Sequence, residues 1–145
     1  MLGLLRQRFN FIVVDLPTPL TPALHPVVAL ARHVFVLLEA EVTGLRNAHA
    51  LREMLTEIAG RNRVFTVLNR ANRGGGLPVS TISKGLGANP DMTIPDFGRV
   101  MMEAINLGIP AGTRLSGLRR ALAPIVQEIA GIRAAKKKTW WWRRS

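Results

Sequence analysis

Four consecutive large apolar residues, Phe11 to Val14, are followed by a single acid, Asp15, and by a turn at Pro17. An uninterrupted apolar run without alternation is typical of a parallel strand that is covered on both faces. The sequence therefore predicts a buried strand over residues 11–15, with the Asp15 carboxylate at its C-terminal end. Open α/β sheets bind their ligands at that edge, which makes Asp15 the first candidate for a functional residue.

Strand-like and helix-like segments alternate along the chain. Two further apolar runs predict strands over residues 34–38 and 64–68, and a shorter strand is expected over residues 91–95. Helical spacing of apolar residues, bounded by glycine and proline, predicts helices over residues 2–8, 21–32, 44–59, 80–86, 96–107 and 113–130. This alternation indicates one α/β domain, residues 1–132, with a mostly parallel sheet of about four strands and flanking helices.

Composition excludes several classes of protein. The 145 residues include no cysteine, so the chain has no disulfide framework and no thiolate metal site, and the cytoplasm is the expected location. No apolar run is long enough to span a bilayer, because Arg32 and His33 interrupt the best candidate. Residues 133–145 hold six cations and no acid, so only +5 of the +11 net charge falls on residues 1–132.

Residues 133–145 are expected to form a disordered basic tail. Trp prefers the membrane–water interface, and each Lys or Arg adds about 1 kcal/mol of attraction to anionic headgroups. The tail therefore predicts reversible attachment to a membrane surface. A basic end without function is the second interpretation. Nucleic-acid binding is the third, with cations on the phosphates and indoles stacked on unpaired bases. The residues that carry these interpretations are Lys136, Lys137, Lys138, Trp140, Trp141, Trp142, Arg143 and Arg144.

The order of these segments resembles the C-terminal half of the MinD/ParA class of P-loop ATPases. Within that class it looks most like the CpaE/TadZ-type group of the Flp or Tad pilus-assembly systems, over about residues 2–130. Residues 9–17 are similar to the Walker B strand and switch II turn, and residues 29–38 to the helix and strand that follow. Residues 41–48 resemble a helix start of the family, 67–70 a strand that ends in Asn-Arg, and 94–96 a late strand and turn.

The resemblance implies roles for five residues. Asp15 looks like the Walker B acid on the Mg²⁺ side of a nucleotide site, and ATP with Mg²⁺ would be the cofactors. Asn69 and Arg70 resemble the strand end that contacts adenine, and Pro95 and Asp96 the turn that closes over the base. The competing structural interpretation is that Asp15 caps a turn and that Asn69 merely ends a strand.

The chain departs from the family in one essential respect. It contains no G-x-x-x-x-G-K-[ST] phosphate loop, which in the family precedes the Walker B strand together with the switch I acid. One carboxylate without phosphates does not hold Mg²⁺, so neither catalysis nor bound ATP and Mg²⁺ is expected of this chain alone. Because the first strand of the family lies inside the sheet, its loss is expected to expose an edge or a face. Three glycines, residues 74–76, are interpreted as a flexible linker rather than a phosphate loop.

The sequence therefore predicts a pilus-assembly or positioning protein, ATPase-like but without its own phosphate loop. It is expected to act as a localisation or scaffold factor in the cytoplasm, peripheral to the inner membrane. Expected partners are pilus-assembly proteins, a second ATPase-like chain, an anionic membrane surface or a second copy, with nucleic acid less favoured. The alternatives are a non-specific DNA-binding ParA-like partitioning protein, an active ATPase completed by another chain, and a gene fragment without function.

Overall fold

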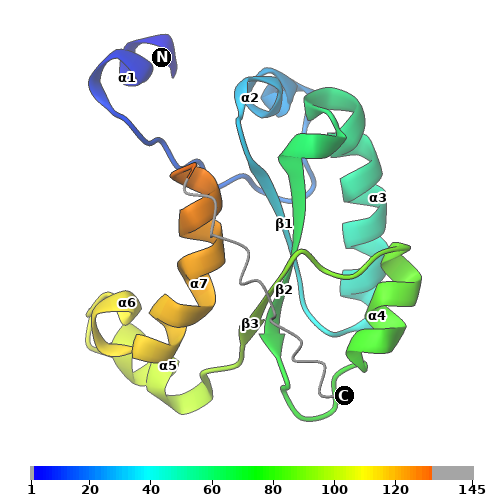
Figure 1. The fold of residues 1–145 in the computed structure, drawn as a ribbon, viewed down its shortest axis with the longest axis vertical. Helices are drawn as coiled ribbons and strands as arrows, with labels where there is room; N and C mark the ends of the chain where they lie inside the picture. Colours follow the sequence, from blue (N-terminus) through cyan, green and yellow to red (C-terminus); the bar gives the residue numbers. More distant parts are fainter. Residues whose placement is uncertain (1, 132–145) are drawn as a thin grey trace, which may run out of the picture.

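The computed structural model describes residues 2–131, in which a three-stranded parallel sheet is flanked by helices (Figure 1). The strands lie in the order β1 (Val34–Leu38), β2 (Val64–Ala71) and β3 (Met92–Pro95). The helices are α1 (Leu2–Arg8), α2 (His25–Leu30), α3 (Val42–Ala59), α4 (Val79–Leu86), α5 (Gly98–Asn106), α6 (Ala111–Arg114) and α7 (Ser116–Ile129), with 3₁₀ turns at Pro22–Leu24 and Arg61–Arg63. The predicted α/β class with a parallel sheet is confirmed.

The main core lies between the sheet and α3. Helix α3 contacts β1 and β2, α4 packs against α3, and α7 contacts β3 on the other side (Figure 1). Apolar side chains of α2, β1, β2, α3 and α4 join in one cluster, which includes Val36, Leu38, Leu55, Leu68 and Ile82. Strands β1 and β2 pair in step from Val34 opposite Val64 to Leu38 opposite Leu68, so both strands end at the same edge of the sheet.

The predicted strand over residues 11–15 is wrong. This segment has no regular structure, and Phe11 and Val13 are 63% and 90% exposed. A strand forms only where a neighbour accepts and donates its backbone hydrogen bonds, and within residues 2–131 no backbone hydrogen bond joins residues 10–20 to β1. The sheet that the structure describes therefore has three strands rather than four, and it ends at β1.

The last predicted helix, residues 113–130, is divided in two. Leu115 adopts an extended conformation (φ −98°, ψ 92°) between α6 and α7, and its side chain is buried. Burial of this one leucine therefore interrupts a segment whose apolar spacing alone predicts a continuous helix.

None of the helices among residues 2–131 is both long enough and apolar enough to cross a membrane. The predicted tail, which includes Lys136 and Trp140 to Trp142, lies outside the described residues, so its role stays a prediction.

Candidate functional site

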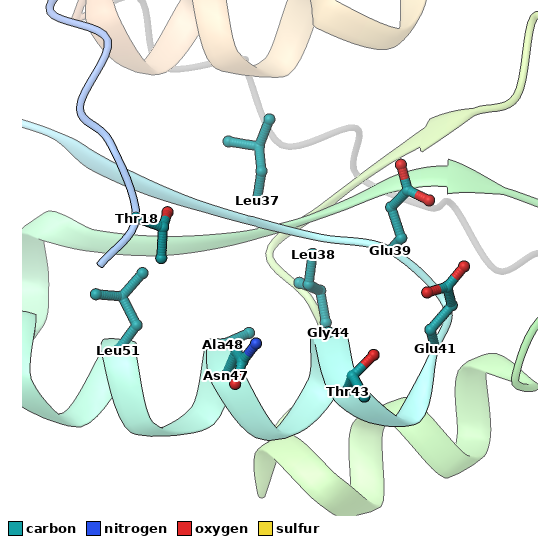
Figure 2. Close-up of a pocket in the computed structure, with 10 residues that line it drawn as sticks. All are labelled: Thr18, Leu37, Leu38, Glu39, Glu41, Thr43, Gly44, Asn47, Ala48 and Leu51. Carbon is teal, nitrogen blue, oxygen red and sulfur yellow. The ribbon is translucent and has the colours of Figure 1, made fainter. Parts of the chain in front are cut away.

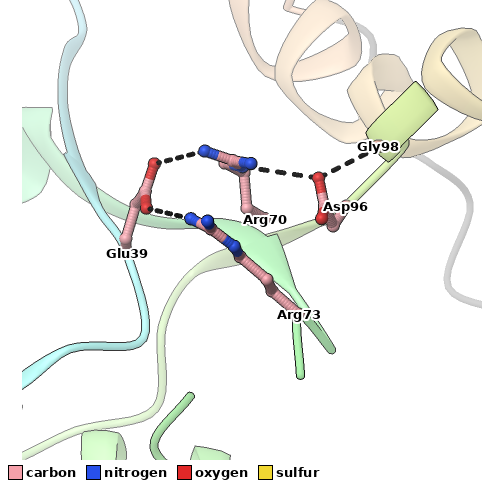
Figure 3. A network of polar contacts seen from close by, with 5 residues as sticks. All are labelled: Glu39, Arg70, Arg73, Asp96 and Gly98. Carbon is pink, nitrogen blue, oxygen red and sulfur yellow. Dashed lines mark hydrogen bonds and ion pairs between the residues drawn. The ribbon is translucent and has the colours of Figure 1, made fainter. Parts of the chain in front are cut away.

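Each of the three strands places one charged side chain at the carboxyl edge of the sheet. Glu39 follows β1, Arg70 lies near the end of β2, and Asp96 follows β3 (Figure 3). Parallel strands bring their carboxyl ends to one edge, which is where open α/β sheets bind ligands. This edge is the candidate functional site.

The backbone of β2 turns Arg70 toward both neighbouring strands. The register between β2 and β3 shifts between Leu68 and Ala71, and Arg70 takes a φ of 52°, which is uncommon for a residue other than glycine. Its Nε donates to Asp96 Oδ1 at 3.3 Å, and its Nη1 lies 3.6 Å from Glu39 Oε1. Arg73 adds a second cation, with Nη1 3.7 Å from Glu39 Oε2.

Asp96 is held in its ionised form by its neighbours. Its Oδ1 accepts the backbone N–H of Gly98, the first residue of α5, at 3.2 Å, as well as Arg70 Nε. The Gly98 hydrogen bond, followed by the bond to Arg70 and the charges of Arg70 and Arg73, lowers the pKa of Asp96 below its usual 3.8. The carboxylate therefore serves as a fixed acceptor rather than as a proton donor near neutral pH.

A pocket of ≈ 200 Å³ lies beside this network. It is lined by Glu39, Ala40, Glu41, Arg70, Arg73, Gly74, Gly75 and Gly76. Gly76 packs against Ala40, just after β1: a Cβ added to Gly76 would lie 3.0 Å from Ala40 Cβ, and Leu77 N–H donates to Ala40 O at 2.7 Å. The segment interpreted from sequence as a linker thus forms one wall of the pocket.

Within residues 1–132 five residues are predicted for the site, and four of them lie at the carboxyl ends of β2 and β3. Arg70 and Asp96 are hydrogen-bonded, Asn69 precedes Arg70 in β2 and is half-buried, and Pro95 ends β3 opposite Ala71. The predicted position of Asp15 at a strand end is wrong, because this residue is exposed in the irregular segment that precedes α2.

Sequence reasoning missed Glu39 and Arg73. The signal for Glu39 was present, since it is an acid that directly follows an apolar run, as Asp15 does. Arg73 gave no such signal, because its approach to Glu39 depends on the turn that follows Arg70 and not on any strand pattern.

The described residues do not fit a Mg²⁺ site. No group of three or more His, Cys, Asp or Glu side chains among residues 2–131 is placed to hold a metal ion. Mg²⁺ takes an octahedral set of oxygens, and both oxygens of Glu39 already face arginines. What the edge offers is recognition: arginine presents a planar face and several donors, which suit an aromatic base or an anionic group.

Known structures resemble this arrangement of elements. No protein-family model and no curated protein matches the chain. The cell division ATPase MinD of Pyrococcus furiosus matches with a TM-score of 0.69 and 21% identity, over 90% of this chain and 55% of that one. The MinD cell division protein of Aquifex aeolicus matches with a TM-score of 0.72 and 20% identity, over 92% and 59%. The septum site-determining protein MinD of Pyrococcus horikoshii, complexed with Mg-ADP, matches with a TM-score of 0.69 and 24% identity, over 91% and 56%.

The comparisons establish a MinD-like ATPase fold for this chain. The chain spans 55–59% of the length of these three structures, so it corresponds to a little more than half of each. At identities of 20–24% the likeness concerns the fold alone.

Proposed function

We propose that this chain is a positioning protein of the MinD/ParA type, which supplies the base side of a nucleotide site and does not hydrolyse ATP by itself. The observation that carries the proposal is the meeting of Asn69, Arg70, Pro95 and Asp96 at the carboxyl ends of β2 and β3. The MinD-like fold of the chain supports it, as does the Mg-ADP bound to one of the similar proteins.

The proposed binding mode follows from how Arg70 is held. Bonds to Asp96 and Glu39 fix the guanidinium, so little side-chain freedom is left to lose when a ligand arrives. Its side chain is still 40% exposed, which leaves a face for an adenine ring beside Pro95. The amide of Asn69 has the donor and acceptor that an adenine edge requires.

The phosphates are assigned to groups outside this 145-residue sequence. Much of the nucleotide affinity of such folds comes from backbone N–H groups that cradle the phosphates, and this sequence has no phosphate-loop motif. A second ATPase-like chain would supply that loop. The protein would then act as a scaffold or localisation factor, with pilus assembly as the setting that the sequence resemblance favours.

A ligand series tests the base-side assignment. Adenosine, ADP and pyrophosphate would be titrated into the full chain by calorimetry, with and without Mg²⁺. We expect adenosine and ADP to bind with dissociation constants within about threefold of each other, because the proposed site does not bind the phosphates. Pyrophosphate should not compete, and no phosphate should be released from ATP.

Two variants sharpen this experiment. Arg70→Ala should weaken adenosine binding about tenfold or more, whereas Arg61→Ala, an exposed arginine at the opposite end of β2, should leave it unchanged. ADP that binds ~100-fold more tightly than adenosine in a Mg²⁺-dependent way would show a phosphate side in this chain and refute the assignment. Absence of adenosine binding at millimolar concentration would refute the base-side role itself.

Localisation at a membrane is a separate part of the proposal, and it rests on the tail. Replacement of Trp140, Trp141 and Trp142 by serine should abolish sedimentation with vesicles that contain anionic lipid. Vesicles of neutral lipid serve as the control, because the basic residues would no longer contribute. Unchanged sedimentation of the triple variant would exclude the tryptophans as the anchor.

A further inference from the structure

Arg70 is held from two sides that differ in how firmly they are themselves held. On the β1 side its partner is Glu39, whose side chain is 39% exposed. Glu39 lies at the rim of a pocket of ≈ 370 Å³ between β1 and α3, and Figure 2 shows its carboxylate directed away from α3. On the β3 side its partner is Asp96, whose side chain is 23% exposed and also accepts the N–H of Gly98. The position of Arg70 therefore depends mainly on what holds Asp96.

Asp96 lies in the short turn that joins β3 to α5. Its backbone N–H donates to Ala71 O of β2 at 3.0 Å, which ties the start of the turn to the sheet. Phe97 O accepts the N–H of Val100 at 3.2 Å and so begins α5, and Gly98 takes a φ of 43°, which is uncommon for other residues. Between these two ends, the side chain of Phe97 is the part of the turn that reaches another element.

The ring of Phe97 packs against α7 at a position that has no side chain. A Cβ added to Gly117, the second residue of α7, would lie 3.0 Å from Phe97 Cε1 and 3.6 Å from Cζ. Gly117 does not have a positive φ, so its backbone does not require glycine, and alanine is the better helix former. The space that the Phe97 ring occupies is therefore the physical reason for glycine at this position.

The first turn of α7 is itself firmly held, so it can act as a wall for this ring. Leu115, directly before α7, is buried. Arg119 Nη1 donates to the carbonyl oxygens of Gly112 and Thr113 in α6, at 2.9 and 3.2 Å, and α7 contacts β3 (Figure 1). A side chain introduced at the contact would therefore displace the Phe97 ring, and the turn with it, rather than α7.

We propose that Phe97 is a positioning residue of the candidate site: its ring, packed against Gly117, holds the turn in which Asp96 fixes the guanidinium of Arg70. The contacts run from α7 to Phe97, from this turn to Asp96, and from Asp96 to Arg70. Phe97 acts through Asp96 and is assigned no contact with the ligand. Its importance for binding rests on the proposed function, because that function assigns the adenine ring to Arg70.

The titration of the Asp96 carboxyl group reports this role without any ligand. The hydrogen bonds from Gly98 and Arg70 lower the pKa of Asp96 below 3.8, so a displaced turn should raise this pKa toward 3.8. NMR titration of the full chain should show the rise in Phe97→Ala and, to a smaller extent, in Gly117→Ala. In Gly117→Ala/Phe97→Leu the pKa should lie closer to that of the parent than in Gly117→Ala, because leucine lacks the ring atoms that the new Cβ meets.

Two control variants separate positioning from a general loss of stability. Gly112→Ala makes the same change in α6, where no atom lies within 4 Å of the added Cβ. Leu55→Ala removes a buried side chain from the main core on α3. Both should leave the pKa of Asp96 unchanged, although Leu55→Ala lowers the melting temperature.

Adenosine binding to the same variants tests the consequence for the site. Phe97→Ala should raise the dissociation constant of adenosine about threefold or more in the parent, and should add nothing further to Arg70→Ala, because changes that act through one contact are not additive. A parent chain that does not bind adenosine would refute the base-side assignment. The titration of Asp96 would then still decide the positioning role.

Three results would overturn the positioning role. The first is a pKa of Asp96 that is the same in the parent, in Phe97→Ala and in Gly117→Ala. The second is an equal rise of this pKa in Leu55→Ala, which would reflect a loosening of the whole fold. The third is an adenosine affinity that Phe97→Ala lowers by the same factor with and without Arg70.

Discussion

Asp91 Oδ2 accepts two hydrogen bonds from Thr66, one from the backbone N–H at 2.6 Å and one from the hydroxyl at 2.9 Å. The Thr66 hydroxyl oxygen in turn accepts the backbone N–H of Asp91 at 3.3 Å. Thr66 is buried within β2, and Asp91 directly precedes β3. This reciprocal pair therefore determines where β3 begins alongside β2.

Removal of the Asp91 carboxylate should destabilise the protein. Asp91→Ala leaves the buried Thr66 hydroxyl without its acceptor, so we expect the free energy of unfolding in urea to fall by about 1–3 kcal/mol. Asp91→Asn keeps one acceptor oxygen and should lose less. Asn89→Ala, an exposed change in the same turn, is the control, and a loss no larger than that of the control would contradict this role.

The stability that Asp96 contributes should depend on pH. Its pKa is lower in the folded protein than the usual 3.8, so the unfolded chain binds the proton first as the pH falls. The contribution is therefore fully present above pH 3.8 and is lost as the pH drops through the folded pKa. The stabilities of the parent and of Asp96→Asn in urea should differ at pH 6, and the difference should shrink progressively as the pH falls below 3.8. Glu57→Gln on α3 controls for the loss of one charge, and an unchanging difference would exclude the linkage.

The left-handed backbone at Arg70 predicts an unusual order of substitutions. Arg70→Gly and Arg70→Ala both lose the bonds to Glu39 and Asp96, but only alanine keeps a Cβ that the positive φ disfavours. The glycine variant should therefore be more stable by about 1 kcal/mol, measured by urea unfolding. At Arg73, where φ is not positive, glycine should give no such advantage.

Close packing between α3 and α4 predicts intolerance at Gly85. A Cβ built there lies 2.5 Å from Leu45 Cδ2 and 3.0 Å from its Cγ, so the leucine must move. Gly85→Ala should lower the free energy of unfolding by about 1–2 kcal/mol, despite the higher helix propensity of alanine. Gly112→Ala in α6, with no atom within 4 Å of its Cβ, should not destabilise. The added change Leu45→Ala should reduce the penalty of Gly85→Ala, and failure to do so would locate the clash elsewhere.

The sequence pattern predicted most of the elements because the apolar residues of β1, β2 and α3 do pack against one another. It could not predict that residues 11–15 stay irregular. Their composition is that of a strand, but a strand also depends on a neighbouring backbone, which hydrophobic pattern does not encode. The division between α6 and α7 was likewise hidden, because it depends on the burial of Leu115.

The candidate site was predictable only where strand ends define it. Asn69, Arg70, Pro95 and Asp96 lie at the carboxyl edge, as expected for residues that end parallel strands. The ion pairs of Arg70 and Arg73 with Glu39 were not predictable, since they depend on a register shift and a positive φ in β2. Whether these residues bind a nucleotide stays a prediction.

Since Glu39, Arg70 and Asp96 come from three different strands, their contacts span the width of the sheet. If a molecule contacts all three residues, its binding would be linked by mass action to global unfolding rather than to the opening of a single loop. At 100 times its dissociation constant it would add about 2.7 kcal/mol to the folded state. Amide hydrogen exchange would then slow along β1, β2 and β3 together, including amides that the molecule never touches.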